Sequence, residues 1–201
     1  MIEIAENALQ ITVLMVCSGI SLYRALEHKS RTWTLAAFFF TSWVLGDLYW
    51  TVCLLFYDKA PQISIVSDLS WYASYMFLYL LLIRTAEPQD VDKRQILPWL
   101  GPVFAAVMAI FFIQWGEILN NLVYASLMGL LLYASISRLI KRKQKYLSAL
   151  ILVFCLLEYG LWTSSCIWSG DTLANPYYWF DVLLTLSFLL FLPAVRKAVS
   201  A

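Results

Sequence analysis

Four carboxylic acids lie inside stretches of the chain that are otherwise apolar enough to cross a membrane: Asp47, Asp68, Glu158 and Asp181. No lysine or arginine lies at a comparable depth in these stretches to neutralise them. A carboxylate within the hydrocarbon core of a membrane is energetically costly, so acids retained there tend to mark a ligand or ion pathway. The four acids therefore predict where a site lies, without identifying the molecule that occupies it.

Tryptophan and tyrosine residues lie close to these acids in the sequence. Carboxylates attract a positive charge strongly where the dielectric constant is low, and an aromatic face adds a cation–π attraction of roughly 0.5–2 kcal/mol. An organic amine or quaternary ammonium ion would use both, whereas Na⁺ or a proton would use the acids alone. We therefore predict a small cationic or amine-bearing ligand. The predicted ligand-binding residues are Asp47, Trp50, Asp68, Trp71, Tyr72, Glu158, Trp162 and Asp181.

The same residues have structural interpretations. Asp68 and Asp181 lie about 6 Å from a span end at the helical rise per residue, where they would be partly hydrated or would cap a helix. Asp47 and Glu158 lie deeper, at about 13–15 Å, where the structural alternative is a protonated acid bonded to a neighbouring helix. Aromatic residues at a membrane interface commonly form a belt. Belt positions are expected at Trp115, Trp168, Tyr177, Tyr178 and Trp179.

Other chemistries find less support in the residue types. A zinc site needs histidine or cysteine ligands at suitable spacing, and the only histidine, His28, is predicted in a loop. A Ser-His-Asp triad cannot form in the membrane without a histidine there, and the seven glycines form no phosphate-binding loop. We predict no catalytic residue, metal or cofactor. An acid-only hard-metal site and an acid–base enzyme acting on lipid remain open alternatives.

The composition is that of an integral membrane protein. Of the 201 residues 62% are hydrophobic, and the mean hydropathy is +0.73, whereas soluble domains are nearer half apolar. Charged residues make up 13% and the net charge is +1, which implies no nucleic-acid partner. The first six residues are acidic, unlike the basic start of a signal peptide. We expect one multi-pass domain over residues 1–201, in a plasma membrane of the bacterial type.

Hydropathy predicts an all-α bundle of seven transmembrane helices. Each apolar run approaches the roughly 20 residues that a span requires. Pro61, Pro88, Pro98 and Pro176 lie at or near the ends of these runs, where helices begin or break. The connections between the runs are short. The predicted spans are 7–26, 33–57, 64–84, 97–115, 118–139, 147–168 and 177–195.

The distribution of basic residues predicts the orientation. With seven spans, 13 of the 14 lysines and arginines fall on one side and only Lys59 falls on the other. Basic residues favour the cytoplasmic side, so the N-terminus is predicted outside and the C-terminus inside. The basic run 138–145 is interpreted as a topological anchor. If the protein is a sensor, a cytoplasmic partner protein would dock at Lys141–Lys145. The cytoplasmic set is Arg24, Lys29, Arg31, Arg84, Lys93, Arg94, Arg138, Lys141, Arg142, Lys143, Lys145, Arg196 and Lys197.

Two parts of the chain, 7–84 and 118–196, resemble each other. In each an acid precedes a Trp-Thr pair by three or four residues, as Asp47 precedes Trp50 and Glu158 precedes Trp162. This spacing places acid and Trp on the same helix face. The helix at 97–115 would link the two parts, which gives a parallel three-plus-one-plus-three repeat. Parallel repeats are one known way to build transporters, although the abundance of Trp and Leu makes chance a rival explanation.

The helix plan resembles that of sugar-efflux and vitamin transporters built from triple-helix repeats, and that of microbial opsins. The strings Asp-Leu-Tyr-Trp at 47–50 and Ser-Asp-Leu-Ser-Trp-Tyr at 67–72 resemble the seven-helix sensor regions that precede bacterial cyclic-dinucleotide signalling domains. A retinal opsin is disfavoured, because the seventh span has no mid-membrane lysine and Lys197 lies at its end.

These observations favour a transporter with an outward-facing acidic and aromatic pocket. A receptor-like sensor or partner subunit that uses the same pocket is the alternative, and an intramembrane enzyme acting on lipid is a weaker one. Membrane lipid and a small molecule are the expected partners, and the oligomeric state is left open. Cys53 and Cys166 both fall near the outer ends of spans, so a disulfide between them is compatible with the sequence.

Overall fold

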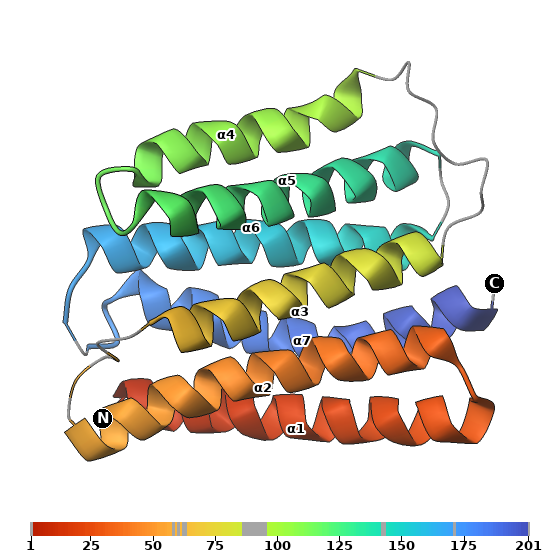
Figure 1. The fold of residues 1–201 in the computed structure, drawn as a ribbon, viewed down its shortest axis with the longest axis horizontal. Helices are drawn as coiled ribbons and strands as arrows, with labels where there is room; N and C mark the ends of the chain where they lie inside the picture. Colours follow the sequence, from red (N-terminus) through yellow and green to blue (C-terminus); the bar gives the residue numbers. More distant parts are fainter. Residues whose placement is uncertain are drawn as a thin grey trace.

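The computed structural model describes residues 2–57, 59, 61, 64–85, 96–141, 144–170 and 172–200. Within those ranges the chain is helical and contains no β-strand. Figure 1 shows the helices side by side, running in alternating directions. They are α1 (Ile2–His28), α2 (Arg31–Tyr57), α3 (Ile65–Arg84), α4 (Leu100–Phe112), α5 (Ile118–Ile140), α6 (Lys145–Ile167) and α7 (Pro176–Ser200), and a 3-10 turn, η1 (Leu97–Trp99), precedes α4.

Tight turns separate two pairs of antiparallel helices, α1 from α2 and α4 from α5. Lys29 adopts a left-handed conformation (φ 48°) directly after α1, and the amide of Ser30 bonds back to the carbonyl of Ala25. This is a common way to end a helix. Gly116 has a φ of 76° between α4 and α5, a conformation that glycine adopts without steric cost. These turns bring α2 back alongside α1 and α5 back alongside α4.

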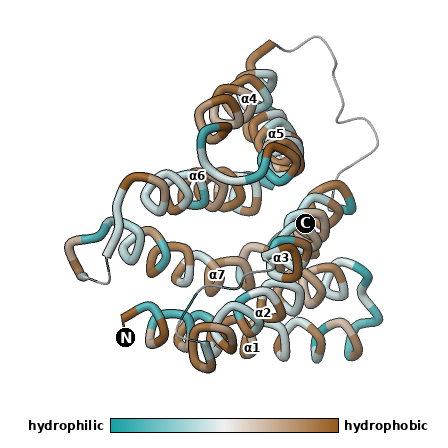
Figure 2. The backbone as a smooth tube through the Cα atoms, turned by 60° about the vertical axis from the view of Figure 1, so that its left-hand side comes forward, coloured by the Kyte–Doolittle hydropathy of each residue, from teal (hydrophilic) through white to brown (hydrophobic). Residues whose placement is uncertain are grey.

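Six helices form a closed ring. In order around it, α1 contacts α2, α2 contacts α3, α3 contacts α5, α5 contacts α6, α6 contacts α7, and α7 contacts α1. The fourth helix, α4, lies outside this ring against α5 (Figures 1 and 2). Phe104 and Phe112 of α4 also contact the ring of Tyr159 in α6. The predicted role of α4 as a linker between two three-helix parts stays a prediction.

Close packing of α4 on α5 depends on Gly101. A methyl group at this position would lie 2.6 Å from Cβ of Leu132. The absence of a side chain therefore lets the two backbones approach closely, as small residues commonly do between membrane helices.

Six of the described helices are long and apolar enough to cross a membrane, which indicates a multi-pass membrane protein: α1, α2, α3, α5, α6 and α7. The predicted span 97–115 corresponds to an apolar helix over Leu97–Phe112 that is shorter than these six. It covers about 25 Å, whereas the hydrocarbon core is about 30 Å thick. The helix ends early because the chain turns at Gly116. A seventh span therefore stays a prediction.

An aromatic cluster fills the middle of the ring. Phe39, Trp43, Phe154, Phe188 and Phe191 are all buried, and their ring centroids lie 5.0–6.3 Å apart in successive contacts. These residues come from α2, α6 and α7, so three of the six ring helices meet here. This packing leaves the middle of the ring apolar.

Charge separates the two ends of the bundle. The described basic residues lie at the end where α1, α3, α5 and α7 finish, hereafter the basic end, with Lys59 as the exception. The C-terminus lies at this end and the N-terminus at the other (Figure 1). This separation is what the positive-inside interpretation requires, and the orientation in a membrane stays a prediction. Pro88, Lys93, Arg94, Arg142 and Lys143 lie outside the described residues.

Arg138 differs from its expected role as a surface anchor. Its side chain is buried, and Nη1 donates to Oε1 of Gln144 at 3.1 Å and contacts Oγ1 of Thr85 at 3.4 Å. Gln144 in turn donates to the carbonyl of Thr85. Arg138 thus joins the ends of α3 and α5 to the start of α6.

The four cysteines are all free thiols. Cys53 and Cys166 therefore form no disulfide in this structure, and Cys17, Cys53 and Cys155 are buried as small apolar side chains.

Candidate functional site

A cavity of about 370 Å³ opens at the N-terminal end of the ring. All six ring helices and the α4–α5 turn contribute to its wall. Along α3 it extends from Ser64 to Tyr75, a depth of about 16 Å at the helical rise. The lining residues are Asn7, Gln10, Trp43, Asp47, Trp50, Ser64, Asp68, Trp71, Tyr75, Gly116, Glu117, Asn120, Asn121, Glu158, Leu161, Trp162, Ser165, Tyr177, Asp181 and Leu184.

The four predicted acids all line this one cavity. They come from four helices, α2, α3, α6 and α7, and each side chain is at most 6% exposed. Among the described residues no lysine, arginine or histidine forms an ion pair with any of them. Each acid is instead held by a neutral hydrogen-bond donor from another helix.

Asp47 is held by the indole of Trp71. Nε1 of Trp71 donates to Oδ1 of Asp47 at 3.0 Å, and Oδ2 of Asp47 is buried without a partner in the described part of the chain. The contact depends on Gly46, because a Cβ there would lie 2.6 Å from Nε1 of Trp71. The Gly46-Asp47 pair thus supplies both the space for the indole and the carboxylate that it binds.

Glu158 is held by a tyrosine of α3. The hydroxyl of Tyr75 donates to Oε2 of Glu158 at 2.8 Å, and Oε1 has no partner among the described residues. Tyr124 of α5 packs its ring 5.9 Å from that of Tyr75, and its hydroxyl is also buried and unpartnered in the same residue set. Glu158 therefore lies among phenol groups, and one of its carboxylate oxygens has no partner among the described residues.

Asp68 is bonded to α5 as well as to its own helix. Oδ2 accepts from Oγ of Ser64 and from Nδ2 of Asn120, both at 2.9 Å. It makes no capping bond to the backbone amides of α3. Tyr72 donates to the carbonyl oxygen of Asn120 at 3.2 Å. Tyr72 does not line the cavity, so it supports Asn120 from behind rather than forming a wall.

Asp181 is bonded to α1. Nε2 of Gln10 donates to Oδ1 of Asp181 at 2.6 Å and contacts Oγ1 of Thr185 at 3.0 Å. Glu6, one turn before Gln10, is also buried and lies close enough to Asp181 for the two carboxyl groups to interact directly. Neither carboxylate oxygen of Glu6 accepts a hydrogen bond from a neutral or basic group among the described residues. Two carboxyl groups therefore adjoin on this side of the cavity.

The three tryptophans that were predicted as walls of the site come together at one cavity. Trp50, Trp71 and Trp162 all line the cavity, and the rings of Trp50 and Trp71 are 6.0 Å apart. Nε1 of Trp50 donates to Oε1 of Glu3 at 3.1 Å. Among the residues interpreted as a belt, Trp168 and Trp179 are indeed exposed, whereas Tyr177 lines the cavity and Tyr178 is buried.

The sequence analysis did not identify several polar residues of α1 and α5 that line the cavity, nor Glu6, which lies beside Asp181. The first span was predicted from residue 7, which left Glu6 outside it, whereas α1 begins at Ile2. The spacing of Glu6 and Gln10, four residues apart on one helix face, was the available signal. The other polar residues missed are Asn7, Asn120 and Asn121.

The lining of the cavity combines carboxylates with amide groups and aromatic rings. Within the described ranges no group of three or more histidine, cysteine or acidic side chains is arranged to hold a metal ion. The acids offer free oxygens at separate points of the wall, between aromatic faces and amide groups. Such a surface can attract a cation and orient its hydrogen-bond donors.

Searches of protein-family models, of curated proteins and of solved structures find no match to this chain.

Proposed function

We propose that this membrane protein binds a small organic cation in the cavity at the N-terminal end of the ring. The observation that carries the proposal is the convergence of Asp47, Asp68, Glu158 and Asp181 from four helices on one cavity of about 370 Å³. That volume lies in the lower part of the range for small-molecule sites, so a compact amine or quaternary ammonium ion fits best.

Incomplete bonding of the acids supports a positively charged occupant. Trp71 and Tyr75 each satisfy one oxygen of a deep acid, which leaves Oδ2 of Asp47 and Oε1 of Glu158 free. A buried carboxylate oxygen without a partner is costly. A cation between these two residues would supply the missing attraction at a low dielectric constant.

The aromatic walls favour an organic cation over Na⁺. Trp50, Trp71 and Trp162 present indole rings to the same cavity. A methylated ammonium group gains from each face that it touches, whereas a small hydrated ion gains little. Affinity should therefore fall when the charge is kept but the methyl groups are removed.

Transport of the cation is the first form of this proposal, supported by the arrangement of the two three-helix parts. When the sequences of the two parts are aligned so that Arg24 matches Arg138, Asn7 matches Asn121 and Glu6 matches Asn120. Glu6 approaches Asp181, and Asn120 donates to Asp68, so each contact joins the first helix of one part to the last helix of the other. A duplicated unit with a shared site is a known transporter plan.

Sensing without transport is the second candidate, favoured by the aromatic cluster below the cavity. Phe39, Phe154 and Phe188 are no more than 1% exposed and close the ring toward the basic end. Passage of a cation would require these rings to separate, whereas a sensor only needs the ring helices to shift when the cavity fills.

The binding test compares choline with 3,3-dimethyl-1-butanol, its uncharged analogue of the same shape. Purified protein in detergent should bind choline and ignore the alcohol, as measured by calorimetry and thermal unfolding. Asp47→Asn and Glu158→Gln should each weaken choline binding by about tenfold or more, since each removes a buried charge. The matched control is Glu27→Gln at the basic end, which should bind as the wild type does.

Equal binding of choline and the alcohol, or unchanged affinity in both cavity variants, would refute the proposed site. Uptake of labelled choline into proteoliposomes then separates the two candidates. Uptake that Asp47→Asn abolishes supports transport, whereas binding with no uptake supports sensing.

A further inference from the structure

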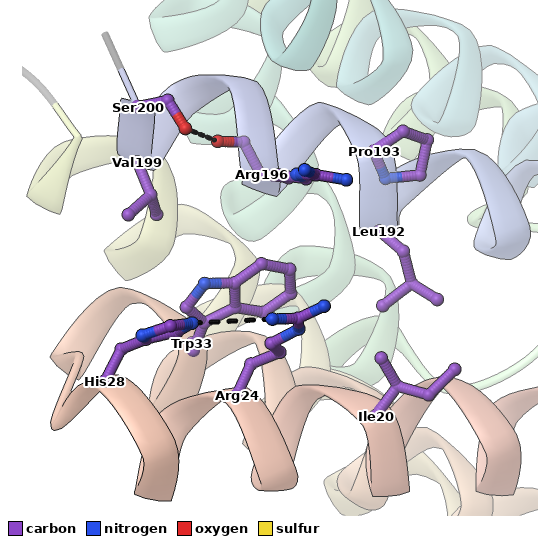
Figure 3. Close-up of a pocket in the computed structure, with 9 residues that line it drawn as sticks. All are labelled: Ile20, Arg24, His28, Trp33, Leu192, Pro193, Arg196, Val199 and Ser200. Carbon is purple, nitrogen blue, oxygen red and sulfur yellow. Dashed lines mark hydrogen bonds between the residues drawn. The ribbon is translucent and has the colours of Figure 1, made fainter.

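A second hollow lies at the basic end, on the outside of the ring between α1 and α7. Its volume is about 760 Å³. Figure 3 shows α1 below it, α7 above it and the indole of Trp33 from α2 at its back. We call it the α1–α7 groove. Its lining residues are Ile20, Arg24, His28, Trp33, Leu192, Pro193, Arg196, Val199 and Ser200.

Two arginines from different helices lie in this groove. The guanidinium of Arg196 has no hydrogen-bond or ion-pair partner among the described residues, and only its carbonyl oxygen is bonded, by Ser200. Arg24 contacts Oε2 of Glu27 at 3.2 Å and Nε2 of His28 at 3.5 Å, and its side chain is 44% exposed. The groove is lined by two arginines and a histidine, and none of its described lining residues is an acid. Glu27 contacts Arg24 and His28 but not Arg196, so the groove has an excess of positive charge.

Two aliphatic residues of the groove lie one helical turn farther toward the middle of the bundle than the arginines. Ile20 precedes Arg24 by four residues in α1, and Leu192 precedes Arg196 by four residues in α7. Because α1 and α7 run in the same direction, the two arginines lie at one level and the two aliphatic side chains at a deeper one. Ile20 is 42% exposed, so this deeper part opens outward from the protein.

We propose that the α1–α7 groove binds an anionic phospholipid. The phosphate lies between Arg24 and Arg196, because guanidinium groups bind phosphate oxygens through paired, charge-assisted hydrogen bonds. An acyl chain follows Ile20 and Leu192 toward the middle of the membrane. Charge and apolar surface are thus arranged in the order in which a lipid presents its headgroup and its chain.

Membrane placement supports a lipid over a soluble phosphate ester. α1 and α7 are both helices long and apolar enough to span the membrane. Arginines at their basic ends lie at headgroup level, where basic pockets between membrane helices bind anionic headgroups. A soluble phosphate ester would use the arginines and leave Ile20 and Leu192 unused. This proposal is independent of the cation site, which lies at the opposite end of the ring.

The test measures thermal unfolding of the purified protein in mixed micelles. Phosphatidylglycerol is titrated in parallel with phosphatidylcholine of the same chains and with glycerol 3-phosphate. The wild type should be stabilised by phosphatidylglycerol only. Arg24→Gln and Arg196→Gln should each raise the phosphatidylglycerol concentration for half-maximal stabilisation by about fivefold. Both residues are partly or fully exposed, so the variants are expected to fold.

Arg84→Gln is the matched control, because Arg84 is an exposed arginine at the same end of the bundle but outside the groove. It should respond to phosphatidylglycerol as the wild type does. An equal loss in Arg84→Gln would assign the effect to general surface charge and overturn the proposal. Equal stabilisation by the two lipids, or by glycerol 3-phosphate alone, would overturn it too.

Discussion

The acids near the mouth of the cavity, Asp68 and Asp181, have different hydrogen-bond partners on its two sides. On the side of α3 and α5, Asp68 accepts hydrogen bonds from Ser64 and Asn120. On the side of α1 and α7, Asp181 accepts one from Gln10 and adjoins a second carboxyl group, that of Glu6. The first side is satisfied by neutral donors, whereas the second combines two acids with a single amide.

This difference shows where the cavity most needs a positive charge. Two adjacent buried carboxylates repel each other strongly, so a proton or a cation near them would stabilise the pair. Asp68 has no such requirement, because its bonded neighbours are uncharged. The α1–α7 side is therefore expected to respond to ligand and substitution more strongly than the α3–α5 side.

Removal of the single amide on the α1–α7 side should have the largest effect. Gln10→Leu leaves Asp181 beside Glu6 with no amide donor, and the free energy of unfolding should fall by about 3 kcal/mol. Asn120→Leu is the matched change on the other side and should cost only about 1 kcal/mol, because Ser64 still donates to Asp68. The measurement is SDS-induced unfolding in detergent. Equal losses would show that the two sides do not differ.

An added methyl group at Gly46 should have an intermediate effect. Gly46→Ala forces the indole of Trp71 away from Asp47, which should cost about 2 kcal/mol in unfolding free energy and weaken choline binding. Gly129→Ala is the control, since a Cβ there meets its nearest neighbour at an ordinary 3.5 Å. If Gly46→Ala unfolds and binds as the wild type does, the Trp71–Asp47 contact does not shape the cavity.

Neutralisation of Glu6, in the Glu6–Asp181 pair, should have the smallest effect on stability. Unlike the other substitutions, it should raise the free energy of unfolding. Glu6→Gln removes the repulsion at Asp181 and supplies a donor, so unfolding free energy should rise by up to about 1 kcal/mol. Choline should bind more weakly, because one carboxyl group is lost. The comparison is with Glu3→Gln, which changes a neighbouring acid bonded to Trp50. A loss of stability in Glu6→Gln would argue against a repulsive pair.

Local sequence signals predicted much of this molecule. Apolar runs of sufficient length located the six long helices, with ends that differ by a few residues. The position of Asp47 and Glu158 within such runs predicted buried acids, because burial of a charge needs a reason that the local sequence does not supply. Gly46 before Asp47 carried no recognised signal, since its role depends on an indole from another helix.

Other features depended on distant contacts and could not be predicted. Tyr72 and Trp71 are adjacent aromatic residues, and both were predicted to bind the ligand. Because successive side chains point in different directions around a helix, Tyr72 contacts Asn120 rather than the cavity. Tyr177 lines the cavity although its place near a span end is typical of a belt. Glu6 was not predicted as part of the site, because the polar residues at the start of α1 are typical of a segment that precedes a membrane span.

The amino-acid sequence alone determined the class of the protein, since hydrophobicity and length act locally and do not depend on the partners of a helix. It also determined that acids lie within the apolar helices. Only the tertiary structure decided that these acids share one cavity, that α4 stays outside the ring, and that Glu6 adjoins Asp181. Those relations depend on the order and rotation of packed helices, which arise from many weak contacts between residues far apart in the chain.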